Sequence, residues 1–430
     1  MGPFEFATAG RVVVGAGRAA DLPSLVAGLG SRAFVCTGSR PVGLVDGPVF
    51  PVRGEPTVEV ARDAVAAARA HGADVVVAVG GGSVIDLGKA VAMLLANGGD
   101  PLDYLEVVGT GRAITEPSLP FVAVPTTAGT GAEVTANAVL ASPEHAVKAS
   151  LRSPLMLPRL AVVDPLLTLS CPPAVTASSG LDALTQCLEP LVSAEANPLT
   201  DGLAGEGLRR AASGLRRAYA DGSDVAARSD MAVCGLLGGM ALANAKLGAV
   251  HGFAGVIGGA FDVPHGLACA ALLVPVVEAN VRSLRAREPA SPSLARYEEA
   301  ARRLTGRTDA SIEDGVAWLR ETVALLEAPR LRSYGLTPEH ADDIVAKAAK
   351  ASSMRGNPIA LNPDELHAIL AAALESRCSR PARGSARSRP TTSQRPSRVW
   401  WMPSPRSLYR PGGAEQRRRV VPRGPRAVSA

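Results

Sequence analysis

The sequence is short of three things: aromatic residues, paired cysteines and unbroken apolar runs. Aromatic residues make up only 3% of the 430 residues, and the six cysteines, at positions 36, 171, 187, 234, 269 and 378, include no C-x-x-C pair. Scattered cysteines argue against a disulfide framework and predict reduced thiols in a cytoplasmic protein. No run of 18 apolar residues free of charge occurs, and the N-terminus has no basic region ahead of an apolar one. We therefore predict neither a membrane span nor a signal peptide.

The net charge of +5 conceals two unlike parts. Residues 376–430 hold fourteen arginines and one glutamate, a net of +13, which leaves −8 for residues 1–375. An acidic body gives no support for nucleic-acid binding by the folded part. The tail, rich in Arg, Ser and Pro, has no periodicity and is expected to be disordered. It is either a nucleic-acid or membrane arm, or non-native sequence from a shifted reading frame in a GC-rich gene; the second interpretation is favoured.

The stretch DVVVAVGGGSVIDLGKA, residues 74–90, carries the strongest local signal. Its apolar run is typical of a strand buried on both faces of a parallel sheet. Gly80, Gly81 and Gly82 end that strand, and Ser83 is suited to cap the helix that follows. Glycines let an anion approach the backbone, and a helix N-terminus presents free N–H groups. The turn therefore predicts a phosphate site. It matches neither GxGxxG nor GxxxxGK[ST], so the alternative is a tight turn without a ligand.

Short strands and helices alternate over residues 1–165, with strands expected at 11–15, 32–36, 48–52, 74–79 and 120–124 and helices at 19–29 and 57–71. This alternation predicts an open, mostly parallel α/β sheet, which binds ligands at the carboxyl ends of its strands. After Asp164-Pro165 the sequence turns into long Ala/Leu-rich stretches, with helices expected at 173–193, 199–219, 224–246, 291–305, 311–327, 338–351 and 364–375. We predict an α/β domain over 1–165, an all-helical domain over 166–375 and the basic tail over 376–430.

A second loop signal is VPTTAGTGAEVT, residues 124–135. Thr126, Thr127 and Thr130, interspersed with Gly129 and Gly131, follow a strand and supply hydroxyl groups and mobile backbone at its carboxyl end. Such a loop can wrap a pyrophosphate or a nicotinamide. By itself the signal is moderate, because loops of threonine and glycine are common.

The third signal lies in the helical part. In GLDALTQCLEPLVS, Asp182 and Gln186 are four residues apart and share one face of a helix. In HGFAGVIGGAFDVPHG, His251 and His265 are fourteen residues apart, and each is followed by glycine. A carboxylate and two imidazoles from different segments can meet at a divalent metal, whereas each histidine taken alone is equally well explained as a hydrogen-bonded structural residue.

Taken together, these motifs resemble the iron-containing (group III) alcohol dehydrogenase family, which shares its fold with glycerol dehydrogenase and dehydroquinate synthase. The matching pieces are GGGSVIDLGKA, VPTTAGTGAEVT, the Asp164-Pro165 junction, GLDALTQCLEPLVS and HGFAGVIGGAFDVPHG, in the order and at the spacing of the family. The resemblance covers residues 4 to about 375 and implies a dinucleotide-binding domain followed by a helical domain, with the active site in the cleft. It also implies a homodimer or a larger homo-oligomer.

The resemblance assigns roles residue by residue. Gly80, Gly81, Gly82 and Ser83 would hold the cofactor pyrophosphate with Asp86 and Lys89 close by, and Thr126, Thr127 and Thr130 match the second cofactor loop. The family binds iron or zinc through one Asp and three His, and Asp182, His251 and His265 match three of these ligands. The fourth position holds Gln186, whose amide oxygen is a weaker ligand than imidazole.

A second departure is Gly255, where many members carry a histidine assigned to proton relay. Two of the imidazoles of the family are therefore absent. Either this branch uses a site of three ligands plus Gln186, or it reduces its substrate without a tightly held metal, or it has lost activity.

The sequence also contains residues that bear on the choice between NAD and NADP. An acid near the end of the second strand of such a sheet binds the ribose hydroxyls and repels a 2′-phosphate. Here that strand is followed by Gly38, Ser39 and Arg40, with no acid. Ser39 and Arg40 could instead hold a phosphate, so we predict that NADP is accepted alongside or in preference to NAD; the alternative for Arg40 is a solvated surface charge.

The sequence thus predicts an NAD(P)-dependent oxidoreductase that interconverts a small alcohol and an aldehyde or ketone by hydride transfer, assisted by a divalent metal. The alternatives are a metal-free or non-catalytic NAD(P)-binding relative and, less favoured, a maleylacetate reductase-type or dehydroquinate synthase-type enzyme. The synthase chemistry needs several basic residues around a substrate phosphate, and residues 179–193 and 251–265 contain none. No membrane or nucleic-acid partner is expected for the folded part.

Overall fold

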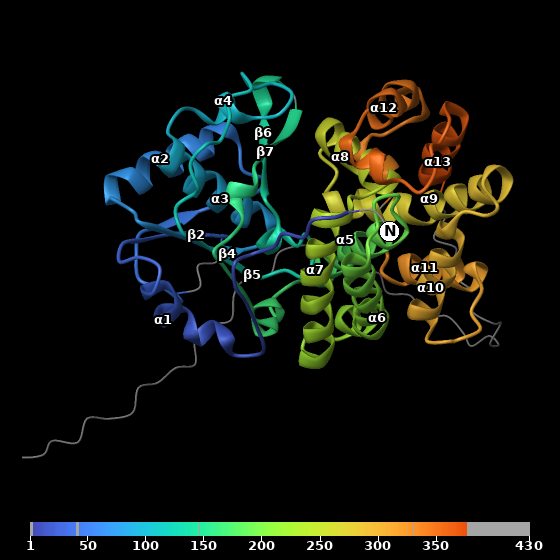
Figure 1. The fold of residues 1–430 in the computed structure, drawn as a ribbon, viewed down its shortest axis with the longest axis horizontal. Helices are drawn as coiled ribbons and strands as arrows, with labels where there is room; N and C mark the ends of the chain where they lie inside the picture. The colour runs from blue at the N-terminus through green and yellow to red at the C-terminus, as the bar shows by residue number, and fades with distance from the viewer. Residues whose placement is uncertain (1–2, 40–42, 146, 329, 376–430) are drawn as a thin grey trace, which may run out of the picture. The chain divides into compact units, whose positions relative to one another are not determined.

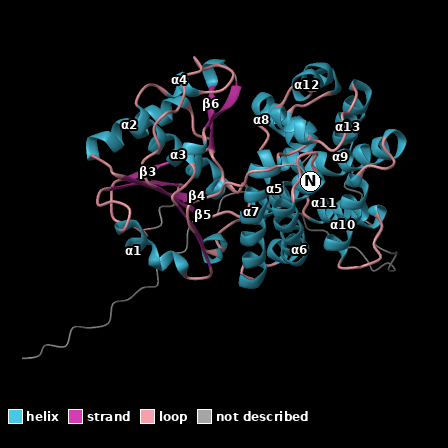
Figure 2. Cartoon of the chain, viewed as in Figure 1, coloured by secondary structure: helices cyan, strands magenta, loops and turns pink. Residues whose placement is uncertain are grey.

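The computed structural model describes residues 3–39, 43–145, 147–328 and 330–375. The predicted tail and Arg40 lie outside these residues. A parallel α/β region is followed by a helical region, which confirms the predicted fold class (Figure 1). The strands end at Val163, and helices make up the chain from Pro173 onward (Figure 2). The boundaries proposed for the domains stay a prediction.

The first region is built on a six-stranded sheet in which every neighbouring pair is parallel. Its order is β1-β8-β5-β4-β2-β3. The strands are β1 (Val12–Val14), β2 (Ala33–Thr37), β3 (Val49–Pro51), β4 (Val75–Gly80), β5 (Phe121–Pro125) and β8 (Leu160–Val163). All residues of β2, β4, β5 and β8 are buried, as the continuous apolar runs in the sequence predict.

Helices cover both faces of this sheet, which explains why its strands are apolar on both sides. Val76 and Ala78 of β4 pack with α2 (Val58–His71) and α3 (Gly82–Asn97). The alternate residues of β4 pack on the other face with α1 (Leu22–Ala27). The short helix α4 (Pro101–Tyr104) lies beyond α3 in the chain. Burial of one valine side chain stabilises the fold by roughly 1.5–3 kcal/mol, so these two cores hold the sheet in place.

The strand order reverses direction beside β4. From β2 the chain moves outward to β3 at one edge, and it then returns to β4 and continues through β5 and β8 toward the opposite edge. Ligands of open parallel sheets bind at such a switch point, outside the carboxyl ends of the strands. The residues that follow β2, β4 and β5 therefore occupy the favoured position for a ligand.

Two parts of the α/β region differ from the sequence prediction. The helix expected over 19–29 is a turn of 3-10 helix (Arg18–Asp21) followed by the six-residue α1, because Pro23 favours a new helix start at that point. An unpredicted antiparallel hairpin, β6 (Asn137–Ser142) and β7 (Val147–Arg152), precedes β8. Its strands alternate buried and exposed residues, so they lack the continuous apolar run that marked the strands of the central sheet.

The helical region packs nine helices of the described chain around one core. They are α5 (Pro173–Val192), α6 (Pro198–Ala220), α7 (Val225–Ala245), α8 (Ala249–Phe261), α9 (His265–Arg287), α10 (Pro292–Thr305), α11 (Ile312–Leu325), α12 (Ala341–Ala348) and α13 (Pro363–Glu375). The sequence patterns missed α8 and α9, because residues 251–266 are rich in glycine, which disfavours a helix. Those glycines instead lie inside helices.

Two of these helices, α7 and α9, are long and apolar enough to cross a membrane by length and composition alone. In α7, 56% of the most apolar window is buried inside the protein, and in α9 the share is 72%. Residues of both helices belong to the central helical core. Packing in that core accounts for their apolar composition.

A buried lysine ties α3 to the hairpin. Lys89 is 1% exposed, and its Nζ donates hydrogen bonds to Thr135 Oγ1 at 2.9 Å and to the Asn137 carbonyl at 2.8 Å. Desolvation lowers the pKa of Lys89 to about 8, partly offset by Asp86 and Glu133. Desolvation also raises the pKa of Glu133 to about 7, partly offset by its own backbone and by Lys89.

This arrangement predicts a pH-dependent cost of burying Glu133. Its pKa in the folded state lies above the ordinary value of 4.5, so the folded protein holds this proton more tightly than the unfolded chain, and stability falls as the pH rises between the two values. Glu133→Gln should lessen the fall in unfolding free energy between about pH 5 and about pH 8 by on the order of 1–3 kcal/mol. Denaturant titrations at several pH values measure it. The exposed Glu116→Gln is the control, and parallel curves for wild type and Glu133→Gln would contradict the prediction.

Candidate functional site

Two glycine-containing loops meet at the switch point of the sheet. Gly81 is the N-cap of α3 and has no side chain to cap the helix, so the first N–H groups of α3 have no side-chain partner there. The helix begins at Gly82, one residue before the predicted cap Ser83, which lies in its first turn. The Thr126 N–H donates to the Gly80 carbonyl at 2.9 Å and joins the second loop to the first.

The threonines of the second loop lie against these glycines. A Cβ atom added at Gly82 would lie 2.8 Å from the Thr130 side chain, and one added at Gly81 would lie 3.4 Å from Thr127. Glycine is therefore required at Gly82 for the two loops to touch. The structure brings together the predicted residues 80–83, Thr126, Thr127 and Thr130, and it places Gly38 and Ser39 after β2, the strand paired with β4.

Asp86, also predicted to bind the cofactor, has contacts of a different kind. Its Oδ2 accepts a hydrogen bond from the Val139 N–H at 3.1 Å, and its Oδ1 lies 3.9 Å from Lys89 Nζ. Desolvation raises the pKa of Asp86 to about 6, against the opposing effect of Lys89. These contacts join α3 to β6, so the structure gives Asp86 a supporting position, and its binding role stays a prediction.

The second loop also contacts the helical region without intervening side chains. A Cβ atom added at Gly239 of α7 would lie 2.6 Å from the Cα of Gly131, and one at Gly129 would lie 2.7 Å from Ser179 Cβ of α5. The second loop therefore packs directly against α5 and α7. Since Asp182 lies three residues after Ser179 on the same helix, this packing fixes the second loop about one turn of α5 from a predicted metal ligand.

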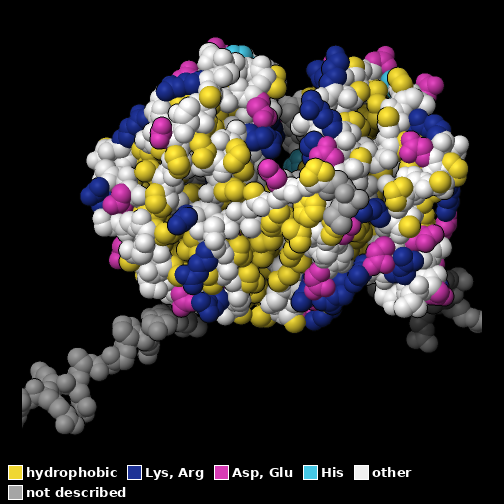
Figure 3. All heavy atoms as spheres, viewed as in Figure 1, with side chains coloured by type: hydrophobic (Ala, Val, Ile, Leu, Met, Phe, Trp, Pro, Cys, Tyr) yellow, Lys and Arg dark blue, Asp and Glu magenta, His cyan; other side chains and the backbone are white. Residues whose placement is uncertain are grey.

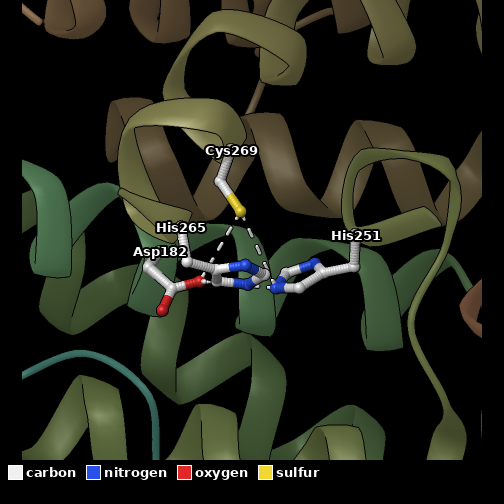
Figure 4. Close-up of side chains that lie close together, drawn as sticks. All are labelled: Asp182, His251, His265 and Cys269. Atoms are coloured by element: carbon white, nitrogen blue, oxygen red, sulfur yellow. Dashed lines mark hydrogen bonds and ion pairs between the residues drawn. The ribbon is translucent and has the colours of Figure 1, made fainter. Parts of the chain in front are cut away.

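Three of the predicted metal ligands converge in the helical region (Figure 4). The Nε2 atom of His251 lies 3.3 Å from Asp182 Oδ1, and the Nε2 atom of His265 lies 3.8 Å from the same oxygen. The centres of the two imidazole rings are 5.3 Å apart. A fourth side chain, Cys269, joins the group, and one donor atom from each of the four lies within 4.8 Å of the others.

Three helices deliver these side chains. Asp182 is on α5, His251 is in the first turn of α8, and His265 is the first residue of α9. The link between α8 and α9 is short and begins at Asp262, which adopts a left-handed conformation with φ of 52°. This tight reversal brings the start of α9 back to the start of α8, and fourteen residues of sequence separation become one site.

The site opens to solvent on the side of His265. The side chains of Asp182 and His251 are 3% and 5% exposed, whereas that of His265 is 43% exposed. Nearby, Lys148 Nζ of β7 lies 4.0 Å from Asp262 Oδ1 and links the hairpin to the α8–α9 turn. Figure 3 shows that this face of the molecule is hollowed between these regions, with basic and acidic side chains at the rim.

Negative and polarisable groups surround the two imidazoles. Desolvation lowers the pKa of His251, but Cys269, Glu189 and Asp182 overcome it and raise the pKa well above the usual 6.5. At Asp182 desolvation raises the pKa, and hydrogen bonds and charge from the histidines, with a hydrogen bond from the Gln186 side chain, lower it overall. The cluster therefore stabilises positive charge at its centre.

The sequence patterns missed Glu189, which positions His251. Its Oε2 accepts a hydrogen bond from His251 Nδ1 at 2.6 Å, and its Oε1 accepts one from the Val250 N–H at 2.7 Å. One carboxylate thus caps the start of α8 and turns Nε2 of His251 toward Asp182. A Cβ atom at Gly248 would lie 2.9 Å from this carboxylate, so the close approach requires glycine. The available signal was a buried acid seven residues after Asp182, on the same helix face.

The sequence patterns also missed Cys269, because a lone cysteine in an apolar stretch is usually part of the core. It lies four residues after His265 on α9, and residues at that spacing share one helix face. Its Sγ is 3.7 Å from Asp182 Oδ1 and 3.9 Å from His251 Nε2. The H-x-x-x-C spacing was the signal in the sequence.

Gln186, the predicted fourth ligand, carries a buried atom without a partner. Its Oε1 is one of four buried side-chain atoms that have no hydrogen-bond partner within the described part of the chain. Leaving such an acceptor unpaired costs about 1–3 kcal/mol, which a ligand, cation or water at the site would recover. The carboxylate, the two imidazoles and this oxygen are donors that suit a divalent metal, so these residues fit the group expected from the sequence.

Comparison with known proteins gives the site its context. The family model described as iron-containing alcohol dehydrogenase matches residues 9–165, and that of the C-terminal part of the same family matches residues 176–374. A 1,3-propanediol dehydrogenase of Klebsiella pneumoniae is 44% identical over 220 residues, or 51% of this chain. In that match the chain spans 56% of the length of the relative, little more than half.

Solved structures extend the match over the described chain. The crystal structure of a 1,3-propanediol oxidoreductase has a TM-score of 0.79 at 32% identity and covers 86% of this chain and all of its own. A sulfoacetaldehyde reductase of Bifidobacterium kashiwanohense, solved in complex with NAD⁺, has a TM-score of 0.77 at 25% identity and covers 88% and 100% of the two chains. These likenesses support the predicted alcohol and aldehyde oxidoreductase. Because family models match both of its regions and solved relatives share its fold, the chain belongs to the iron-containing alcohol dehydrogenase family.

Proposed function

We propose that this protein catalyses reversible hydride transfer between NAD(P) and a small alcohol or its aldehyde or ketone, assisted by a divalent metal. One observation carries the proposal: Asp182, on which His251 and His265 converge, lies on α5, and α5 packs against the loop of Thr126–Gly131. A site for a cation and a site for a dinucleotide are thereby adjacent, as transfer from cofactor to a polarised carbonyl requires.

The side chains of Asp182, His251 and His265 would hold the metal, with the unpartnered Gln186 oxygen in the same site. When bound, a divalent ion such as iron or zinc supplies Lewis acidity that polarises the carbonyl oxygen. The role of the protein is to fix the ligands. Glu189 does so for His251, because its hydrogen bond to Nδ1 leaves Nε2 free to face the cation.

The glycines and threonines at the switch point would hold the cofactor. Gly80–Ser83 offer helix N–H groups to the pyrophosphate, and Thr126, Thr127 and Thr130 offer hydroxyls beside them. The nicotinamide supplies the hydride, and these residues supply its orientation. The dinucleotide would then be held at the carboxyl ends of β4 and β5.

Gly255 changes how the proton is exchanged. Within the described chain, no atom lies within 4 Å of the position a Cβ would take there, and the residue is exposed. Water has room on this part of α8, one turn after His251. Proton exchange with solvent would therefore replace a histidine relay.

For the cofactor we infer that NADP is accepted, because Ser39 is exposed at the end of β2 and no acid follows the strand. From the five free cysteines of the described chain we infer a cytoplasmic location, and from the family a homodimer or larger assembly.

The second candidate is a metal-free or non-catalytic relative, which Gln186 and Gly255 favour. Metal content and turnover separate the two.

Removal of the central carboxylate should abolish both metal binding and turnover. In Asp182→Ala the two imidazoles lose the anion that offsets the charge of the cation. We expect about one iron or zinc ion per chain in the wild type by elemental mass spectrometry and a loss of it in the variant. NAD(P)H oxidation with an aldehyde should fall about 100-fold or more, since the metal contributes several kcal/mol. The exposed Asp63→Ala should match the wild type; turnover by metal-free protein would favour the second candidate.

Glu189→Gln should weaken metal binding without removing a ligand. An amide offers one acceptor oxygen where the carboxylate offers two, so either the Val250 N–H or His251 Nδ1 loses its partner. Loss of such a supporting hydrogen bond lowers metal affinity roughly 10–100-fold. Calorimetric titration of the metal-free protein with Zn²⁺ measures the change. The exposed Glu195→Gln serves as the control, and an unchanged affinity in Glu189→Gln would show that His251 needs no such support.

An acid placed after β2 should discriminate between the cofactors. In Ser39→Asp the new carboxylate would repel the 2′-phosphate of NADPH and accept hydrogen bonds from the ribose of NADH. We expect the dissociation constant of NADPH, measured by fluorescence, to rise about tenfold relative to that of NADH. Ala67→Asp adds the same charge on an exposed face of α2 and should leave the ratio unchanged. A constant ratio in Ser39→Asp would mean that the end of β2 does not contact the ribose.

A further inference from the structure

The cluster of donors contains one group that the proposed function leaves without a role. Cys269 is fully buried on α9, and its sulfur contacts Asp182 and His251. Other cysteines of the described chain have different surroundings: Cys171 donates to the Thr126 carbonyl, and Cys187 and Cys234 lie against each other. Cys269 is the described cysteine that shares its site with a carboxylate and two imidazoles.

The separations between the donors match those of a tetrahedral metal site. Metal bonds of about 2.0–2.1 Å to N and O and about 2.3 Å to S place tetrahedral donors roughly 3.3–3.6 Å apart. Four of the six separations in the cluster are 3.3 Å for His251–Asp182, 3.8 Å for His265–Asp182, 3.7 Å for Cys269–Asp182 and 3.9 Å for Cys269–His251, and all six are within 4.8 Å. Side-chain shifts of about 1 Å or less would bring all four donors onto one ion.

A second observation marks the same place as a ligand site. Gln186 is 3% exposed, and its Oε1 has no hydrogen-bond partner within the described chain. Gln186 follows Asp182 by four residues on α5, and its side chain lowers the pKa of Asp182, so it lies beside the cluster. Two departures from ordinary core packing, an unpaired oxygen and a buried thiol beside an acid, therefore occur around one carboxylate.

We propose that the Cys269 thiolate is the fourth protein ligand of this metal site and takes the place that Gln186 leaves unfilled. The inference rests on the metal-assisted function proposed above. A thiolate is an anionic donor, so with Asp182 it neutralises the two charges of the ion, whereas a neutral amide does not. Gln186 then remains beside Asp182 and outside the set of ligands.

Binding through Cys269 involves proton release and no electron transfer. The S–H bond breaks, a sulfur–metal bond forms, and the proton passes to solvent. Sulfur is a softer donor than imidazole or carboxylate, so a site of one oxygen, two nitrogens and one sulfur favours zinc over iron. Substrate would then add as a fifth ligand, which zinc accepts.

Cobalt(II) provides a readout that is independent of activity. We would load the metal-free, full-length protein with Co²⁺ and record its absorption spectrum. A thiolate ligand gives an intense sulfur-to-cobalt charge-transfer band in the near ultraviolet, and a site of oxygen and nitrogen donors gives weak visible bands alone. We expect the band in the wild type and in the control Cys36→Ala, and its loss in Cys269→Ser and Cys269→Ala. Zinc affinity in the two Cys269 variants should fall roughly tenfold or more.

A rescue variant distinguishes the loss of a ligand from a folding defect. Replacing Gln186 by His supplies the ligand that the family ordinarily has, so the double variant Gln186→His/Cys269→Ala should bind zinc about as tightly as the wild type and show no charge-transfer band. That outcome would establish that the two positions are alternative sources of one ligand. Circular dichroism confirms that each variant is folded.

The remaining outcomes overturn one proposal or both. Visible cobalt bands without a charge-transfer band in the wild type would overturn the role of Cys269 and leave metal-assisted function standing. A charge-transfer band that persists in folded Cys269→Ala would do the same. Failure of the wild type to bind cobalt, zinc or iron would overturn the proposed metal-assisted function together with this inference.

Discussion

Close backbone contact between Gly131 and Gly239 is the constraint on which the arrangement of both sites depends. Neither residue has a side chain, and a Cβ atom added at Gly239 would lie 2.6 Å from the backbone of its neighbour. The second loop can therefore lie directly on α7 and α5. Any larger residue would separate the switch point of the sheet from the helix that carries Asp182. The proposed hydride transfer needs cofactor and substrate in contact, and this packing would bring their sites together.

Burial of charge in the helical region has a chemical consequence. Asp182 and Glu189 lie beside two imidazoles in a core that is otherwise apolar, and carboxylates are expensive to bury unless positive charge accompanies them. In the metal-free protein, protons on the histidines supply that charge. A divalent ion supplies it better, because it faces every donor at once. The electrostatics of the cluster and the family resemblance thus each indicate a divalent cation at this site.

The two departures from the family pattern have different structural settings. Gln186 is buried in the turn of α5 that follows Asp182, and the sulfur of Cys269 lies 3.7 Å from the Asp182 carboxylate. Gly255 is exposed with open space around it, so water can replace the missing side chain. A substitution inside the cluster therefore calls for a compensating residue, and one at its rim does not.

The sequence by itself determined the local elements and the identity of most donors. The Val-rich run before Gly80 could form only a buried strand, and helical spacing put Asp182 and Gln186 on one face, because both properties depend on neighbours in the chain. The sequence also singled out His251 and His265 as candidates, and the resemblance assigned them as metal ligands. The hairpin β6–β7 and the helices α8 and α9 escaped prediction, because half-buried strands and glycine-rich helices have weak local patterns. Only the tertiary structure decided that Glu189 orients His251 and that Cys269 joins the site, since both depend on where α8 and α9 pack against α5. Contacts between distant segments are set by the packing of the whole core, which no local pattern encodes.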